Sequence, residues 1–358
     1  MSKYMELVEW IKEQIFLKNL LLGQKIYSEN ELKELFGVSR QTVRHAIGVL
    51  EQEGIVRRVK GSGTYINDSR FAEGEKRSKV MLVTIGEEAH ILQQILQGME
   101  YVLSEYGYIV QIACTNNQYD KERAILEDII NQDEVAGIIV EMTKSGIPSP
   151  NLHLYEKIWK RRIPILFMNS YCSTLKIPHV SIDNHLAGKN VTKHLIAMGH
   201  QRIGGIFKMD DVRGHQRYAG YVDAMYEAGL EIDDNRILWL DTMDVRNLSK
   251  CRQRILERVE NCTGVFCYND QIACDLMELL KEQGLLIPED ISVVAVDDSD
   301  LLVRDDRKLS TISYSMEKVG EKAAQNLIKM IKNPNFRENY EFETEIVVRD
   351  SVRKLIGK

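Results

Sequence analysis

The chain has little cysteine and no recognisable pattern among its cysteines. Only 6 of 358 residues are cysteine, and none belongs to a C-x-x-C pair. Their spacing matches neither a zinc ribbon nor a disulfide scaffold, so we expect reduced thiols that serve as packing residues. The eight histidines also lack metal-ligand spacing. The sequence therefore predicts neither a metal site nor a cofactor.

Long apolar runs are missing as well. Acidic residues at Glu6, Glu9 and Glu13 interrupt the N-terminal region, which leaves no apolar core of signal-peptide length. No other stretch reaches the about 20 apolar residues that a membrane-spanning helix needs. We therefore expect a cytoplasmic protein with no membrane partner.

Nucleotide-binding and catalytic motifs are absent from the sequence. No G-x-G-x-x-G follows an apolar run, and no P-loop occurs. Many folds can carry an enzyme, so these missing motifs count against catalysis whatever the fold. We predict that the chain is not an enzyme and has no catalytic residues.

Charge and length indicate more than one unit. A chain of 358 residues that is 44% hydrophobic can bury more than one core. Residues 1–70 carry eleven Lys and Arg against nine Asp and Glu, a balance of +2, which leaves −8 for the remainder. The polar residues from 67 to 79 lack periodicity. We expect a head over 1–70 that could bind a polyanion, a linker over 71–79 and a larger domain over 80–358.

The head contains signals for two consecutive short helices. Ser28 and Glu31 form a capping-box pattern at the first helix, and Gly37 is suited to end it. Ser39 is suited to cap the second helix. The first helix is expected to bury Leu32, Leu35 and Phe36. The second is expected to bury Val43, Ala46, Ile47 and Leu50.

The outward face of the second helix is polar and basic in its first turns. In helix-turn-helix proteins these turns enter the major groove, where Arg pairs with guanine and Gln with adenine. Arg40, Gln41 and Arg44 are the candidates for this readout. Ser39 and Thr42 are better placed to bind phosphates, which fix register without reading sequence.

A predicted β-hairpin follows. Residues 55–59 and 64–66 are apolar or β-prone, and they flank the tip Lys60-Gly61-Ser62-Gly63. Two glycines allow the backbone to approach a groove, and Lys60 adds positive charge. Arg57 contributes to the same basic face. We interpret the hairpin as the wing of a winged helix.

Residues 4–66 resemble the GntR family of winged-helix regulators. The resemblance rests on Glu29 and on the runs 37–40, 42–44, 53–54 and 61–64. Tyr27 departs from the pattern, because the family usually has proline there. The residues predicted to bind DNA are Glu29, Ser39, Arg40, Gln41, Thr42, Arg44, Arg57, Lys60, Gly61, Ser62 and Gly63. A winged helix that binds another protein is the alternative.

From residue 80 onward, short runs rich in Val and Ile alternate with amphipathic stretches. The expected strands are 80–85, 109–114, 135–140, 163–168, 203–207, 265–268 and 293–296. The expected helices include 91–106, 120–131, 185–198, 218–228 and 271–282. This alternation predicts an α/β domain of two lobes, each with a parallel sheet covered by helices on both faces. The apolar face with Ile91, Ile95 and Leu96 is either core or a dimer contact.

Five of these apolar runs are followed directly by a polar residue, namely Glu141, Asn169, Lys208, Asn269 and Asp297. Ligands of parallel α/β sheets bind outside the carboxyl ends of the strands. Side chains of these types suit a ligand rich in hydroxyls, since each hydroxyl needs a donor and an acceptor once it is dehydrated. Alternatively, Asn269 and Asp297 only begin turns or cap helices.

The larger domain resembles the effector domain of the LacI/GalR family, which has the two-lobed type I fold of periplasmic sugar-binding proteins. The resemblance rests on the runs 180–184, 199–203, 217–221, 268–273, 287–294 and 297–298. It implies that Arg217, Asn269 and Asp297 contact the effector and that Glu141, Asn169 and Tyr314 line the cleft. Lys208 and His215 complete the predicted effector-binding set.

A GntR-type head on this body is similar to the arabinose repressors of Gram-positive bacteria. That resemblance implies a repressor that binds double-stranded operator DNA and is released by a small sugar, L-arabinose. We hypothesise a homodimer, because paired heads fit successive major grooves of a pseudo-palindromic operator. A regulator that answers to another sugar or a sugar phosphate is the open alternative. A sugar-transport protein would need an export signal and would have no use for a wing.

Overall fold

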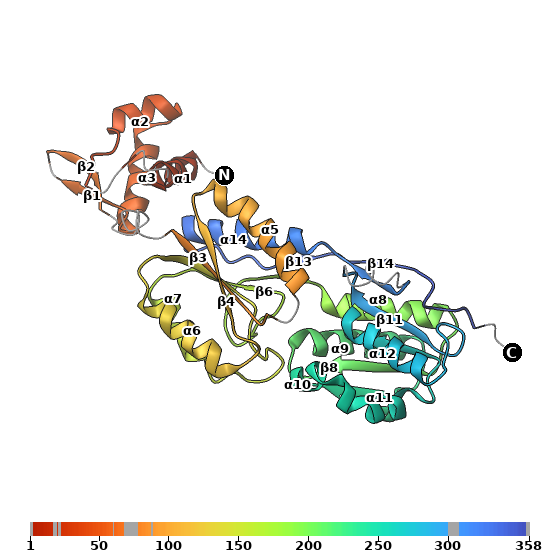
Figure 1. The fold of residues 1–358 in the computed structure, drawn as a ribbon. Helices are drawn as coiled ribbons and strands as arrows, with labels where there is room; N and C mark the ends of the chain where they lie inside the picture. The colour runs from red at the N-terminus through yellow and green to blue at the C-terminus, as the bar shows by residue number, and fades with distance from the viewer. Residues whose placement is uncertain are drawn as a thin grey trace.

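A computed structural model of the chain describes residues 3–16, 20, 23–59, 61–67, 78–86, 89–299 and 308–355. Figure 1 shows a small head at one end, followed by two larger α/β lobes. Lys60 and most of the predicted linker lie outside the described residues. In the part of the chain that is described, no helix has the length and apolar character needed to span a membrane.

The head consists of α1 (Lys3–Phe16), α2 (Glu29–Phe36), α3 (Arg40–Gln52), β1 (Val56–Val59) and β2 (Gly63–Ile66). The predicted caps are confirmed. The Ser28 hydroxyl accepts from the Glu31 amide, the Glu31 carboxylate accepts from the Ser28 amide, and Gly37 ends α2 in the left-handed region. The Ser39 hydroxyl accepts from the Thr42 amide at the start of α3.

The core of the head confirms the predicted buried face of α3 but corrects that of α2. Val43, Ala46, Ile47 and Leu50 are all buried. Leu32 is fully buried, whereas Leu35 is 59% exposed. Leu35 lies about 60° from Leu32 around the helix axis, on the solvent side of this short helix, while half-buried Phe36 packs against Trp10.

The N-terminal lobe contains a sheet of six parallel strands in the order β13-β7-β6-β5-β3-β4. Its strands are β3 (Lys79–Thr84), β4 (Ile109–Cys114), β5 (Val135–Val140), β6 (Ile165–Met168), β7 (His179–Ile182) and β13 (Tyr340–Phe342). One face is covered by α5 (Ala89–Glu105) and α14 (Met316–Lys332), and the other by α6 (Tyr119–Asn131) and α7 (Leu152–Lys160).

The C-terminal lobe repeats this architecture with strand order β14-β12-β11-β10-β8-β9, in which only β14 is antiparallel to its neighbour. Its strands are β8 (Ile203–Lys208), β9 (Ile237–Leu240), β10 (Gly264–Cys267), β11 (Ser292–Asp297), β12 (Ser310–Ser313) and β14 (Glu345–Val347). Among its described residues the α-helices are α8 (Asn184–Ala197), α9 (Val212–Glu227), α10 (Thr242–Arg246), α11 (Arg252–Val259) and α12 (Asp270–Glu282). The same residues form the short 3-10 helices η2 (Asp234–Arg236) and η3 (Leu248–Cys251).

The chain passes between the lobes three times. It leaves the N-terminal lobe between β7 and α8, returns between β12 and α14, and crosses again between β13 and β14. Three adjacent crossovers allow one lobe to rotate against the other while each sheet stays intact. The predicted two-lobed α/β architecture is therefore confirmed.

Each lobe contains one pair of helices in direct backbone contact. In the N-terminal lobe α5 and α14 meet at Gly98 and Gly320, and in the C-terminal lobe α8 and α9 meet at Gly188 and Gly220. A Cβ atom at any of these positions would lie 2.0–2.2 Å from a backbone oxygen of the partner helix. Only glycine fits there without moving a helix.

The six cysteines are free thiols. Cys251, Cys262, Cys267 and Cys274 are buried, as expected for packing residues. Cys114 is exposed, because it ends the edge strand β4, and it corrects that expectation.

Candidate functional site

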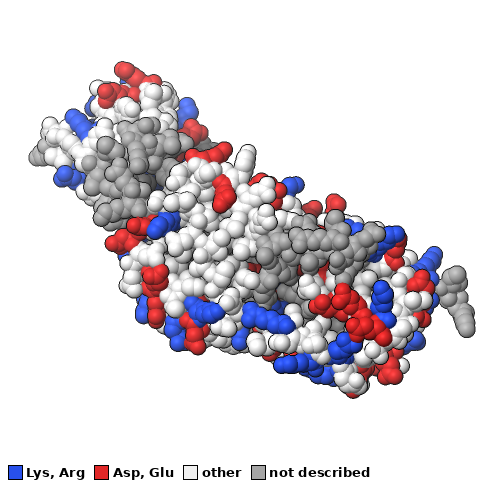
Figure 2. Space-filling view, viewed as in Figure 1, with Lys and Arg blue, Asp and Glu red and all other residues white. Residues whose placement is uncertain are grey.

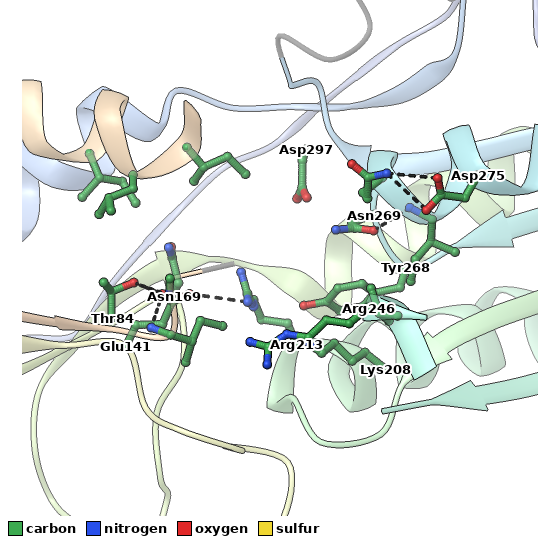
Figure 3. Close-up of a pocket in the computed structure, with 18 residues that line it drawn as sticks. Thr84, Glu141, Asn169, Lys208, Arg213, Arg246, Tyr268, Asn269, Asp275 and Asp297 are labelled. Carbon is green, nitrogen blue, oxygen red and sulfur yellow. Dashed lines mark hydrogen bonds and ion pairs between the residues drawn. The ribbon is translucent and has the colours of Figure 1, made fainter. Parts of the chain in front are cut away.

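A cavity of about 320 Å³ lies between the two lobes, at the carboxyl ends of their strands. Its volume is at the lower end of the range for small-molecule sites, about 300–1,000 Å³. The residues predicted at strand ends all line it, namely Glu141, Asn169, Lys208, Asn269 and Asp297. Figure 3 shows Thr84, Glu141 and Asn169 on one side of the cavity and Tyr268, Asn269 and Asp275 on the other.

The N-terminal lobe supplies one polar and one apolar wall. The Thr84 hydroxyl donates to Glu141 Oε2 at 2.7 Å and holds the carboxylate at the end of β5. The helix α5 contributes an apolar wall of Ile91, Leu92 and Ile95. The sequence left open whether the apolar face with Ile91, Ile95 and Leu96 is core or a dimer contact. In the structure Ile95 is part of the core of the lobe and Ile91 and Leu96 pack against that core, while Ile91 and Ile95 also line the cavity.

Asp297 is held from behind by two donors. Its Oδ1 accepts from Arg217 Nη2 at 3.1 Å and from the Tyr314 hydroxyl at 3.0 Å. The backbone of Asp297 has φ 132°, a region that L-residues rarely adopt. Such strain persists where the surroundings fix it, and it clusters at functional sites.

Asn269 has both of the roles that the sequence left open, helix cap and cavity residue. Its Oδ1 accepts from the Ile272 amide at 3.0 Å and caps α12, and the residue also lines the cavity. Helix capping therefore fixes the orientation of an amide at the cavity wall.

Two predicted effector ligands lie behind the cavity wall. Neither Arg217 nor Tyr314 is among the described residues that line the cavity. Arg217 has no exposed surface, and it donates from Nε to Asn184 Oδ1 at 3.0 Å and from Nη1 to the Tyr268 carbonyl. In this structure both side chains orient Asp297, and direct contact with an effector stays a prediction.

His215 lies apart from the other predicted residues. It is exposed, its Nε2 is 2.7 Å from the Met209 carbonyl oxygen, and its ring packs near Trp239. His215 is absent from the cavity lining that the described residues form. It stands on α9 between Arg213 and Arg217, and successive helical residues point about 100° apart.

Sequence reasoning missed Arg213, which lines the cavity. Its Nη2 lies 3.5 Å from Glu141 Oε1 in the opposite lobe and 2.7 Å from Asp211 Oδ2. Burial alone would raise the pKa of Asp211, but Arg213, Lys208 and the Tyr268 hydroxyl hold it well below its usual range. The spacing of four residues between Arg213 and Arg217 was the available signal, since it places both on one helix face.

The outward face of α3 carries the predicted recognition residues. Ser39, Arg40, Gln41 and Arg44 are exposed and Thr42 is half-buried. The Glu29 carboxylate accepts from the Nε atoms of Arg40 and Arg44, each at 3.0 Å. Burial raises the pKa of Glu29, but the two arginines outweigh this effect and bring the pKa below its usual value, so the carboxylate is ionised. Glu29 therefore fixes the spacing of the two guanidinium groups.

The wing projects beside this face. Gly61 and Gly63 have φ 79° and 133°, a backbone region that favours glycine, and Ser62 between them is exposed. Arg57 is exposed in β1, and Arg58 Nη2 donates to the Arg44 carbonyl at 3.3 Å, joining wing and recognition helix. In Figure 2 positive side chains appear on the left of the head, where Figure 1 places β1 and β2.

Comparison with known proteins covers both parts of the chain. Residues 3–66 match the bacterial regulatory proteins of the gntR family, and residues 192–352 match the periplasmic binding protein-like domain. The arabinose metabolism transcriptional repressor of Halalkalibacterium halodurans is 34% identical, over 98% of this chain and 96% of its own length. That of Geobacillus stearothermophilus is 32% identical, over 99% of both chains.

A solved structure shares the fold of the lobes. The transcription regulator CcpA of Lactococcus lactis superposes with a TM-score of 0.68 at 23% identity, covering 77% of this chain and 100% of that chain. This likeness confirms the predicted fold class of the larger domain.

Proposed function

This chain belongs to the transcriptional repressors that join a GntR-type DNA-binding head to a periplasmic binding protein-like domain, and we propose that L-arabinose is the sugar that releases it from its operator. The observation that carries the proposal is the cavity, in which polar strand ends of both lobes converge. The proposed units are a head over 1–70, a linker over 71–79 and an effector domain over 80–358.

The charge of the cavity favours a neutral sugar over a sugar phosphate. Its described lining includes three basic residues, Lys208, Arg213 and Arg246, and three acidic ones, Glu141, Asp275 and Asp297. A phosphate would add about −1.5 to −2 charges close to these carboxylates. Neutral hydroxyls can instead donate to a carboxylate and accept from a guanidinium.

The choice of L-arabinose among the pentoses is supported by the two full-length relatives named for arabinose metabolism. Isothermal titration of L-arabinose, D-xylose, D-ribose and a pentose phosphate into the purified protein tests it. L-Arabinose is expected to bind most tightly. Preference for another sugar, or for the phosphate, would transfer the proposal to that ligand.

The proposed DNA-binding role is tested at Arg44. Replacing Arg44 with alanine removes one candidate for guanine readout, which is worth about 1–3 kcal/mol or about 5- to 150-fold in operator affinity. Fluorescence anisotropy with the operator fragment measures the loss. The control is Arg161→Ala, which removes the same charge from the N-terminal lobe. Operator binding equal to that of this control would contradict the assignment.

A homodimer completes the proposal. Two heads held by paired effector domains can occupy successive major grooves of a pseudo-palindromic site. Sedimentation equilibrium of the full chain, with and without operator, tests it, and one protomer per operator would exclude it.

A further inference from the structure

We propose that Asp211 positions two cavity residues, Arg213 and Tyr268, and also accepts a hydrogen bond from Ser145 of the opposite lobe. One carboxylate would then couple ligand binding in the cavity to closure of the two lobes. The choice of L-arabinose as the ligand rests on the proposed function, whereas the geometry of the contacts between the lobes does not depend on it.

One oxygen of Asp211 serves the cavity. Oδ2 accepts from Arg213 Nε at 3.0 Å, from Arg213 Nη2 at 2.7 Å and from the Tyr268 hydroxyl at 2.7 Å. Both donor residues line the cavity, while Asp211 itself is 4% exposed and stands behind them. Bonds to an ionised acceptor are about twice as strong as neutral ones, so Asp211 fixes both side chains.

The other oxygen serves the lobe junction. Asp211 Oδ1 accepts from the Ser145 hydroxyl at 3.3 Å and from the Arg213 amide at 2.9 Å. Ser145 belongs to the N-terminal lobe, after β5, whereas Asp211 precedes α9 of the C-terminal lobe. Ser145 Oγ also accepts from the Val212 amide at 3.0 Å. A residue of one lobe thus satisfies the start of a helix in the other.

Asp210 strengthens the same junction. Its Oδ2 accepts from Asn117 Nδ2 of the N-terminal lobe at 3.1 Å and from the Thr242 hydroxyl of its own lobe at 2.7 Å. Asn117, Asp210 and Thr242 are each 4–5% exposed. The side-chain oxygen Oδ1 of Asn117 accepts from the Lys144 amide at 2.7 Å, beside Ser145. We call Asn117, Ser145, Asp210 and Asp211 the clasp.

The clasp and the cavity therefore depend on the same arrangement of the two lobes. Opening the lobes separates Ser145 from Asp211 and Asn117 from Asp210. A ligand that contacts Arg213 and Tyr268 favours the Asp211 orientation that Ser145 needs. Because linkage is reciprocal, contacts that stabilise closure also raise ligand affinity.

Removing the clasp from the N-terminal side tests this coupling. Ser145→Ala combined with Asn117→Ala deletes the side-chain hydrogen bonds that the clasp makes between the lobes and leaves Asp211 with Arg213 and Tyr268. We expect L-arabinose affinity to fall about tenfold and the lobes of the sugar-free protein to lie further apart, as measured between spin labels on each lobe. Ser145→Thr keeps the hydroxyl, so its L-arabinose affinity and its distance between the lobes should match those of the wild type. The control is Ser173→Ala, an exposed serine of the same lobe.

The positioning role of Asp211 is tested by a double-mutant cycle. Asp211→Asn should weaken sugar binding, and adding Ser145→Ala should then cost less than it does in the wild type. Additive losses, or an unchanged lobe distance in the Ser145→Ala, Asn117→Ala variant, would overturn the proposal. The distance measurement needs no sugar, so it decides the clasp even if the wild-type protein binds none of the sugars tested.

Discussion

Arg217 carries a charge that has no access to water. Its guanidinium is balanced by Asp297 at 3.1 Å, beside the bond from Tyr314 to the same oxygen. Removing one partner of a buried ion pair leaves the other charge uncompensated, which costs more than losing a neutral hydrogen bond.

We therefore expect Arg217→Met to lower the free energy of unfolding by about 3–5 kcal/mol. Tyr314→Phe deletes only one hydrogen bond to the Asp297 carboxylate and should cost about 1.5–3 kcal/mol. Urea denaturation of both variants measures the difference. Equal losses would show that the ion pair does not dominate this cluster.

Asp270 predicts a pH dependence of stability. Burial, together with repulsion from Asp297, raises the pKa of Asp270 to about 7, although bonds from the Ser299 amide and the Thr311 hydroxyl oppose the rise. An unfolded aspartate has a pKa of about 3.9. Between these pH values the folded state keeps a proton that the unfolded state has lost. The contribution of Asp270 to stability therefore falls as the pH rises from about 4 to about 7.

Asp270→Asn imitates the protonated carboxyl and should flatten this part of the profile. Urea unfolding at pH 5 and pH 8 gives the change in unfolding free energy for the variant and the wild type. Asp120→Asn, at a carboxylate that is 93% exposed, should leave the wild-type profile intact. A profile for Asp270→Asn as steep as the wild type's would contradict the prediction.

The residues of the site divide by how they reach the cavity. The five strand-end residues were predictable, because parallel strands deliver their carboxyl ends to one place. Arg213 was missed: its spacing from Arg217 indicated a shared helix face, but whether that face meets the cavity depends on the orientation of α9, which the C-terminal lobe sets. The resemblance selected Arg217, which in the structure stands behind Asp297, and His215, which faces solvent.

The glycine contacts between helices predict the effect of a single methyl group. Gly188→Ala would place a Cβ 2.2 Å from the Arg217 carbonyl oxygen and push α8 away from α9. Overpacking of this kind costs about 1–3 kcal/mol. In contrast, Gly48 in α3 has open space around it, so Gly48→Ala should stabilise the head by about 0.5–1 kcal/mol. Thermal unfolding of both variants tests the opposite signs, and destabilisation by both would refute the contact argument.

Helices and strands differ in how well the sequence predicts them. The strands β4 and β5 match their predicted bounds, because six consecutive residues with Val and Ile give a clear signal. The strands β7, β9, β12, β13 and β14 fell outside the prediction. They are only three or four residues long, and all of them except β9 include Ser, His or Glu. Their strand conformation comes from pairing with neighbours in the sheet, which is a tertiary effect.

For the complete molecule, the proposal predicts linkage between sugar and operator. Saturating L-arabinose should weaken operator binding by about 5- to 150-fold, which corresponds to a coupling of about 1–3 kcal/mol. Operator titrations with and without sugar, at one fixed salt concentration, measure it. Asp297→Asn should reduce the effect, because Asp297 lines the cavity. Equal operator affinity with and without L-arabinose would reject it as the inducer.

Strand β3 gives this linkage a short covalent route. Its last residue, Thr84, lines the cavity and binds Glu141, and its first residue, Lys79, ends the predicted linker from the head. Six residues of strand span about 20 Å, and β3 is paired on both sides, with β4 and β5. A strand that is paired on both sides bends little. A rotation of the N-terminal lobe therefore displaces Lys79, where the predicted linker to the head ends, without local unfolding of β3.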